Sequence, residues 1–149
     1  MINIEKIDHI GIKIRDKSIS IMFYDQLGFK LIVDTGCEQG HPIMMEHPSG
    51  VVQNLLGLGI VVDNKNILMN KKEKYAGYTH MALKITDVVE TEAFFLKKKI
   101  EISGRFSFKG MTAIFIRDPD QNVIEFDKYS GQEPGSRLDA KNDGYINHP

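Results

Sequence analysis

The chain repeats its own pattern at an offset of 71 residues, the separation of His9 in the run IDHIGIK from His80 in the run YTHMALK. The alignment needs no insertion between His9 and Asn54, whose counterpart is Glu125. Chance would leave about two or three identical pairs over this length. The alignment has eight, at His9, Lys13, Ile14, Asp16, Phe23, Ile43, Pro48 and Val52 of the first copy. Two copies of one structural unit are therefore predicted.

The first copy has the hydrophobic pattern of a strand, a helix and three further strands. Residues 7–14 alternate between apolar and polar positions, which is typical of a half-buried strand. Asp16 can cap a helix over Ser18–Leu27, and its apolar positions are expected to cover the isoleucine face of that strand: Ile19, Met22, Phe23 and Leu27. Gly-containing and Pro-containing turns separate the predicted strands Lys30–Thr35, Pro42–His47 and Gly50–Leu56. The first unit is predicted to be βαβββ.

The second copy predicts the same order of elements. A strand over 78–85 precedes a helix over Val88–Lys98, and the remaining predicted strands are Glu101–Ser103, 112–117 and 122–128. We expect one domain over residues 1–149, with unit one at about 5–57, a connector at 58–77, unit two at about 78–129 and a polar tail at 130–149. The tail has too few apolar residues to form a core of its own.

Composition narrows the function classes. A net charge of -1 with 26% charged residues gives no broad basic surface, which argues against nucleic acid and favours a small-molecule partner. A single cysteine, Cys37, excludes an internal disulfide framework. The sequence has no apolar run of membrane-spanning length and no signal-peptide pattern, so we expect a cytoplasmic protein without a membrane partner.

Strand alternation places three side chains with metal-binding chemistry on equivalent faces. Ile124 and Phe126 belong to the apolar face of the last strand, so Glu125 faces the other side, as do His9 and His80 in their strands. A pseudo-twofold relation between the two copies would let these side chains converge. Two histidines and one carboxylate with open positions form a set that binds divalent iron, manganese, zinc or nickel. The alternative is that they are ordinary solvated residues of a polar strand face.

The tandem βαβββ units, the histidine that opens each unit and the closing DPDQNVIEF, residues Asp118–Phe126, resemble the vicinal oxygen chelate superfamily. This group includes glyoxalase I, extradiol dioxygenases and the fosfomycin-resistance and bleomycin-resistance proteins. The resemblance implies an α+β fold in which the two units form a cupped, partly open mixed β-barrel with helices outside. It also implies a metal held by His9, His80 and Glu125, with Glu125 as the catalytic base. We further expect a homodimer.

The fourth position of this site departs from glyoxalase I, which has a glutamate where the repeat places Asn54. An amide cannot accept a proton, so a two-carboxylate mechanism is not available from this position. The resemblance therefore implies a divalent-metal-dependent enzyme that chelates an oxygen-rich substrate through two atoms. Lactoylglutathione-lyase-like isomerisation and dioxygenase-type ring cleavage are the leading reactions. A metal-dependent thiol transferase, a metal-free drug-sequestering protein and a regulatory module in which the histidines are incidental are the alternatives.

Overall fold

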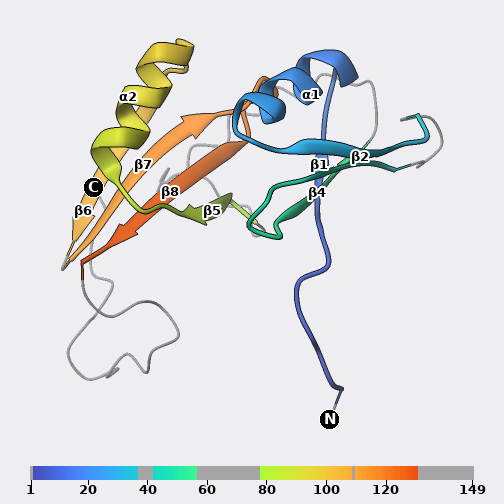
Figure 1. The fold of residues 1–149 in the computed structure, drawn as a ribbon, viewed down its shortest axis with the longest axis horizontal. Helices are drawn as coiled ribbons and strands as arrows, with labels where there is room; N and C mark the ends of the chain where they lie inside the picture. The colour runs from blue at the N-terminus through green and yellow to red at the C-terminus, as the bar shows by residue number, and fades with distance from the viewer. Residues whose placement is uncertain (1, 37–41, 57–77, 109, 131–149) are drawn as a thin grey trace, which may run out of the picture. The chain divides into compact units, whose positions relative to one another are not determined.

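The computed structural model describes residues 2–36, 42–56, 78–108 and 110–130 (Figure 1). Two compact units divide the chain: unit 1 comprises residues 1–64 with 118–120, and unit 2 comprises residues 65–117 with 121–149. The described elements of unit 1 are β1 (Ile10–Lys13), α1 (Lys17–Gln26), β2 (Lys30–Asp34), β3 (Ile43–Glu46) and β4 (Val52–Leu56). Those of unit 2 are β5 (His80–Lys84), α2 (Val88–Lys98), β6 (Ile102–Phe108), β7 (Met111–Arg117) and β8 (Val123–Tyr129).

The described strands form two mixed sheets of the same topology, with strand orders β1-β4-β3-β2 and β5-β8-β7-β6. The first and last strands of each unit are parallel and the other pairs are antiparallel. Gly11 pairs with Asn54 in unit 1, and Ala82 pairs with Glu125 in unit 2. Both pairs keep the offset of the sequence repeat, so the repeat corresponds to an equivalence in three dimensions.

Local irregularities recur in both units as well. The antiparallel register shifts within Leu31–Val33 of β2 and within Ile102–Gly104 of β6, which are equivalent segments. Asp16 caps α1 by accepting a hydrogen bond from a backbone N–H at 2.9 Å, and Asp87 caps α2 in the same way at 2.8 Å. The predicted α+β fold of two βαβββ units is confirmed. The predicted connector 58–77 and the tail residues 131–149 lie outside the described part of the chain.

Helix α1 buries a different face from the one predicted. Ile19 and Met22 are 48% and 60% exposed, whereas Ser20 and Tyr24 are fully buried. The physical reason is a polar contact distant in sequence. The Tyr24 hydroxyl donates to buried Asp118 at 2.8 Å, and Ser20 donates to Asp120 at 3.3 Å. The aromatic ring of Tyr24 supplies the apolar burial that was expected from the aliphatic residues of α1.

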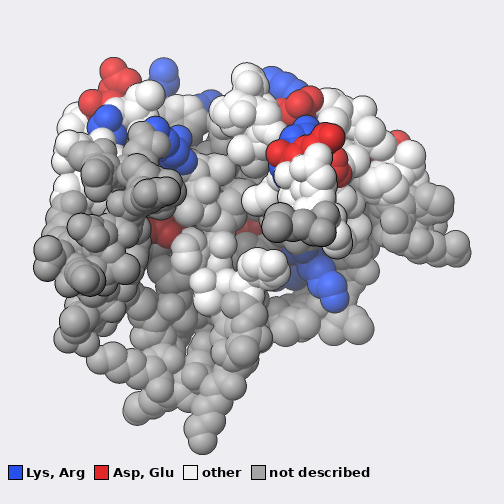
Figure 2. Space-filling model, turned by 90° about the horizontal axis from the view of Figure 1, so that it is seen from below, with Lys and Arg blue, Asp and Glu red and all other residues white. Residues whose placement is uncertain are grey.

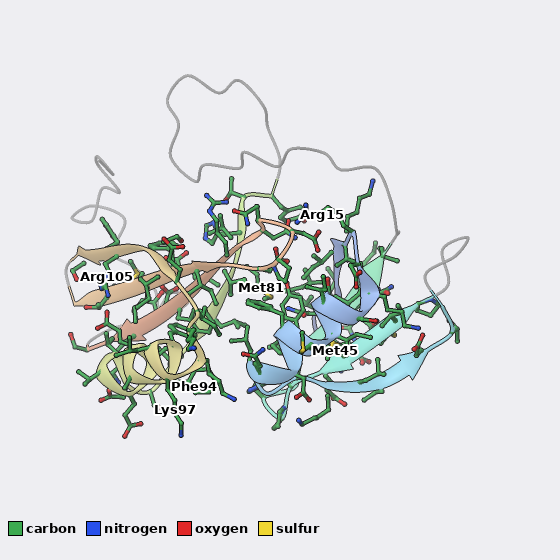
Figure 3. The ribbon with its side chains drawn as sticks, turned by 90° about the horizontal axis from the view of Figure 1, so that it is seen from above. Arg15, Met45, Met81, Phe94, Lys97 and Arg105 are labelled. Carbon is green, nitrogen blue, oxygen red and sulfur yellow. The ribbon has the colours of Figure 1, made fainter. Side chains whose placement is uncertain are left out.

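The buried side of each unit lies between its helix and its sheet. In unit 2 the ring of Phe95 on α2 contacts Phe126 on β8, with ring centroids 5.1 Å apart. In Figure 3, Lys97 extends from α2 away from the sheet, while Met45 of β3, which is fully buried, lies beside α1. Because Phe126 faces α2, its strand neighbour Glu125 faces the opposite side of the sheet.

Candidate functional site

The four predicted site residues lie on the first and last strands of their units. His9 directly precedes β1 and Asn54 lies in β4, both in unit 1, and each unit is described by itself. His80 begins β5 and Glu125 lies at the centre of β8, both in unit 2. The structure therefore brings His80 and Glu125 together in one sheet.

The unit 2 pair is in direct contact. His80 Nε2 lies 2.7 Å from Glu125 Oε2, and the two side chains are 30% and 11% exposed. Residues Ala82 and Glu125 are register partners in the parallel pair β5 and β8, so His80 begins its strand two residues before the glutamate's partner. The alternation that places both side chains on one face was predicted from the sequence, and this contact agrees with it.

Each histidine has its other ring nitrogen held by the preceding residue. His80 Nδ1 lies 2.7 Å from Thr79 Oγ1, and His9 Nδ1 lies 2.8 Å from Asp8 Oδ2. Metal-bound histidines generally have one ring nitrogen held in this way, which fixes the tautomer and aims the other nitrogen. Both histidines therefore have Nε2 as the nitrogen suited to bind a cation.

Glu125 stabilises the protonated form of its partner. The hydrogen bond that Glu125 accepts raises the pKa of His80 above its ordinary value, and partial burial of the imidazole opposes the effect. A hydrogen bond with His9 likewise lowers the pKa of Asp8. A cation bound by His80 Nε2 and Glu125 Oε2 would have to replace the contact between these two atoms.

Asp127 is a fifth chemical group that the predicted set omitted. It lies two residues after Glu125 on the same face of β8 and is only 7% exposed. Its Oδ2 accepts a long hydrogen bond of 3.4 Å from the Tyr129 hydroxyl, whereas Oδ1 is buried without a partner among the described residues. Burial, followed by the neighbouring Glu125 carboxyl, raises the pKa of Asp127 to about 6. The alternation of β8 was the sequence signal for its position, but that pattern gives no information on burial.

Asn54 occupies the equivalent of Glu125 in unit 1. Its cross-strand neighbours are Gly11 and Met44, and its Oδ1 is buried without a hydrogen-bond partner in the described part of the unit. A buried carbonyl oxygen without a donor costs free energy. Asn54 is therefore placed to accept a hydrogen bond from a bound molecule.

The closing motif, residues 118–126, divides between the two units. Asp118–Asp120 belongs to unit 1, where Asp120 accepts hydrogen bonds from the Arg15 backbone at 3.1 Å and from Arg15 Nε at 2.7 Å. Burial, followed by the charge of Asp118, raises the pKa of the Tyr24 hydroxyl. Asp118 and Asp120 therefore make structural contacts within unit 1. Glu125 is the acid of the motif that contacts a predicted metal-binding histidine.

A divalent cation fits the donors of unit 2. Ligand atoms bound to one cation at 2.0–2.2 Å lie roughly 3 Å apart when they are adjacent in the coordination shell. The separation of His80 Nε2 from Glu125 Oε2 is close to this value. No set of three or more His, Cys, Asp and Glu side chains that could hold a metal occurs among the residues that the structure describes. The described part of the chain thus supplies a two-residue half-site.

Positively and negatively charged side chains are mixed on the described surface. Figure 2 shows Lys and Arg side chains close to Asp and Glu side chains, with no broad patch of one charge on the face in view. Among the residues that the structure describes, none of the helices has the length and apolar character needed to cross a membrane.

The chain is a protein of two tandem βαβββ units, each with a four-stranded mixed sheet. Residues 6–126 match the Glyoxalase/Bleomycin resistance protein/Dioxygenase superfamily, and the chain belongs to that family. No curated protein sequence matches the chain. The family assignment predicted from the repeat and the closing motif is therefore confirmed.

Solved structures show the same fold. A glyoxalase/dioxygenase from Nostoc punctiforme has a TM-score of 0.67 and 20% identity, over 87% of this chain and 94% of that one. TnmS3, an antibiotic binding protein from Streptomyces sp. CB03234, has a TM-score of 0.66 and 16% identity, over 87% and 100%. Virulence protein STM3117 from Salmonella typhimurium has a TM-score of 0.57 and 24% identity, over 86% and 99%. At these identities the likeness shows the fold alone.

Proposed function

We propose that this protein is a divalent-metal-dependent enzyme that binds a small oxygen-rich substrate through two of the substrate's oxygen atoms. The observation that carries the proposal is the contact of His80 Nε2 with Glu125 Oε2 at 2.7 Å. The contact of His80 Nδ1 with Thr79 supports it, because metal-bound histidines generally have their other ring nitrogen held.

His80 and Glu125 would hold the cation, and His9 is proposed as the third ligand. The assignment of His9 comes from the repeat, and the contact of its Nδ1 with Asp8 supports it. A bound divalent cation supplies Lewis-acid chemistry, because it polarises the substrate oxygens that it contacts. Its identity is proposed to be iron, nickel, zinc or manganese.

Glu125 is proposed to act as the catalytic base. Its carboxylate is nearly buried on the face that carries His80, and His80 contacts one of its oxygens. In an isomerisation this carboxylate would remove a proton from one substrate carbon and return it to the next. In ring cleavage it would serve as a ligand and orient the substrate. Isomerisation and dioxygenase-type cleavage are the two reactions within this proposal.

Metal analysis of protein purified without chelator tests the proposal. We expect about one divalent ion per chain in the wild type, and a large loss in His80→Ala and Glu125→Gln. The matched control is His47→Ala, because His47 contacts Ser49 and Phe29 in unit 1 and is not a proposed ligand. Equal metal content in the wild type and in both site variants would overturn the proposal.

A further inference from the structure

Asp127 is buried with an unsatisfied carboxylate oxygen on the face that carries His80 and Glu125. Phe126 faces α2 through its contact with Phe95, so Asp127, the next residue in β8, faces the opposite side. Asp127 is 7% exposed, and its Oδ1 has no hydrogen-bond partner in the described residues. A buried acceptor without a donor is expensive unless another molecule supplies the donor.

The fold itself does not require a carboxylate at this position. The repeat equivalent of Asp127 is Leu56, which pairs with Lys13 as Asp127 pairs with Lys84. The backbone contacts are also the same: the carbonyl of Leu56 accepts a hydrogen bond of 3.0 Å, and that of Asp127 accepts one of 2.8 Å. Unit 1 therefore has an apolar side chain at the equivalent position of β4, and the cost of burying Asp127 supports a role in binding.

The neighbouring groups determine what kind of donor the site would take. Glu125 Oε2 contacts His80 and the Glu125 carboxyl also lies beside Asp127, whereas the buried Asp127 Oδ1 has no hydrogen-bond donor among the described residues. Its other oxygen receives only the long contact from Tyr129. Its strand neighbours are Lys84, which is exposed, and Ala113, which has no polar atom in its side chain. Hydrogen bonds from cationic donors to a carboxylate are about twice as strong as neutral ones.

We propose that Asp127 is a specificity-determining residue, whose Oδ1 accepts a hydrogen bond from a protonated amine of the substrate. The inference rests on the proposed function, because it assumes that the oxygen-chelating end of the substrate binds at His80 and Glu125. The substrate class is then a vicinal oxygen compound with a basic amine. An anionic group at the same end of the substrate would meet the Asp127 carboxylate and be rejected.

Three catechols that differ in the charge of one substituent test this specificity. We would measure the Kd of dopamine, neutral 4-ethylcatechol and anionic 3,4-dihydroxyphenylpropionate by calorimetry with zinc-loaded protein at pH 7.5. The wild type is expected to bind dopamine more than about tenfold more tightly than 4-ethylcatechol, and the anion most weakly. Asp127→Asn should bring the affinities for dopamine and 4-ethylcatechol together. Glu101→Gln, at an exposed acid of unit 2, should keep the preference.

Two results would overturn the proposal: equal affinities of the wild type for dopamine and 4-ethylcatechol, or a preference for dopamine that persists in Asp127→Asn. If none of the catechols binds, the proposed chelation fails and the role of Asp127 is decided by the stability of the ligand-free protein. Asp127→Leu, which introduces the residue found at the equivalent position of unit 1, should then unfold at a higher denaturant concentration than the wild type. A lower midpoint would assign Asp127 a structural role and reject the inference.

Discussion

Asn54 and Glu125 occupy the same position of the two repeats, since Asn54 pairs with Gly11 and Glu125 pairs with Ala82 in identical parallel registers. One copy thus carries an amide where the other carries a carboxylate. The repeated backbone therefore has two equivalent positions, of which the one with Glu125 can accept a proton and the one with Asn54 cannot.

Replacement of Asn54 by glutamate tests which reaction the site performs. In an open-site enzyme the new carboxylate would fill a coordination position that the substrate needs, so activity should fall although metal binds more tightly. We predict this fall, measured as kcat at saturating metal. A one-base isomerase would instead keep or raise its activity, because Asn54→Glu adds a proton acceptor. Asn54→Asp is the matched variant, because it introduces the same negative charge on a side chain that is shorter than that of glutamate.

The protonation of His80 should depend on Glu125. The hydrogen bond from Glu125 raises the pKa of His80, so Glu125→Gln should lower it, as measured from the imidazole proton shifts in NMR. A raised folded-state pKa stabilises the fold below the unfolded value of about 6.5, and this contribution is lost as the pH rises through the folded-state pKa. An unchanged His80 titration in Glu125→Gln would contradict the assigned contact.

Asp127 should make the protein less stable at neutral pH than at mildly acidic pH. Burial and the neighbouring Glu125 carboxyl raise the pKa of Asp127 to about 6, above the unfolded value, so the folded state binds the proton more strongly. The unfolding free energy should then fall as the pH rises from about 4 to about 6, by roughly 1–3 kcal/mol. Urea titrations of Asp127→Asn should lack this component. An identical pH profile in the variant would refute it.

The residues that follow the C-terminal ends of α1 and α2 allow a matched test of backbone strain on the free energy of unfolding. Gly28 and Lys99 are equivalent residues with positive φ values, of 96° and 57°. Because a residue with a Cβ atom is strained in this region, Lys99→Gly should raise the unfolding free energy by about 0.5–1 kcal/mol. Gly28→Ala should lower it, since a Cβ atom there would also lie 3.1 Å from the His47 ring. Denaturant midpoints of the two variants would decide, and a lower midpoint for Lys99→Gly or a higher one for Gly28→Ala would count against the strain argument.

The sequence predicted the elements well because the repeat and the local signals agree. Asp16 caps its helix as expected, and the strand alternation placed Glu125 opposite Phe126, which contacts the helix. The buried face of α1 was wrong because the partner of Tyr24 is Asp118, which is distant in the sequence and invisible to a local pattern. Asp127 was placed on the right face, but its burial depends on tertiary packing.

The third ligand and the cup between the units remain predictions from the repeat and the family resemblance. The structure places His80 and Glu125 in one sheet of unit 2, and His9 lies directly before the equivalent strand of unit 1. The orientation of each Nδ1 by the residue before it is a feature that the sequence pattern did not disclose. In each histidine the preceding residue contacts Nδ1, which leaves Nε2 as the other ring nitrogen.

The most direct test of the central claim is a crystal structure of zinc-loaded protein with anomalous diffraction at the zinc edge. The account predicts one strong anomalous peak bound by His80 Nε2, a Glu125 carboxylate oxygen and His9 Nε2, with the hydrogen bond between His80 and Glu125 replaced by bonds to zinc. A peak held by other residues, or a zinc-saturated crystal with no peak at His80 and Glu125, would contradict it.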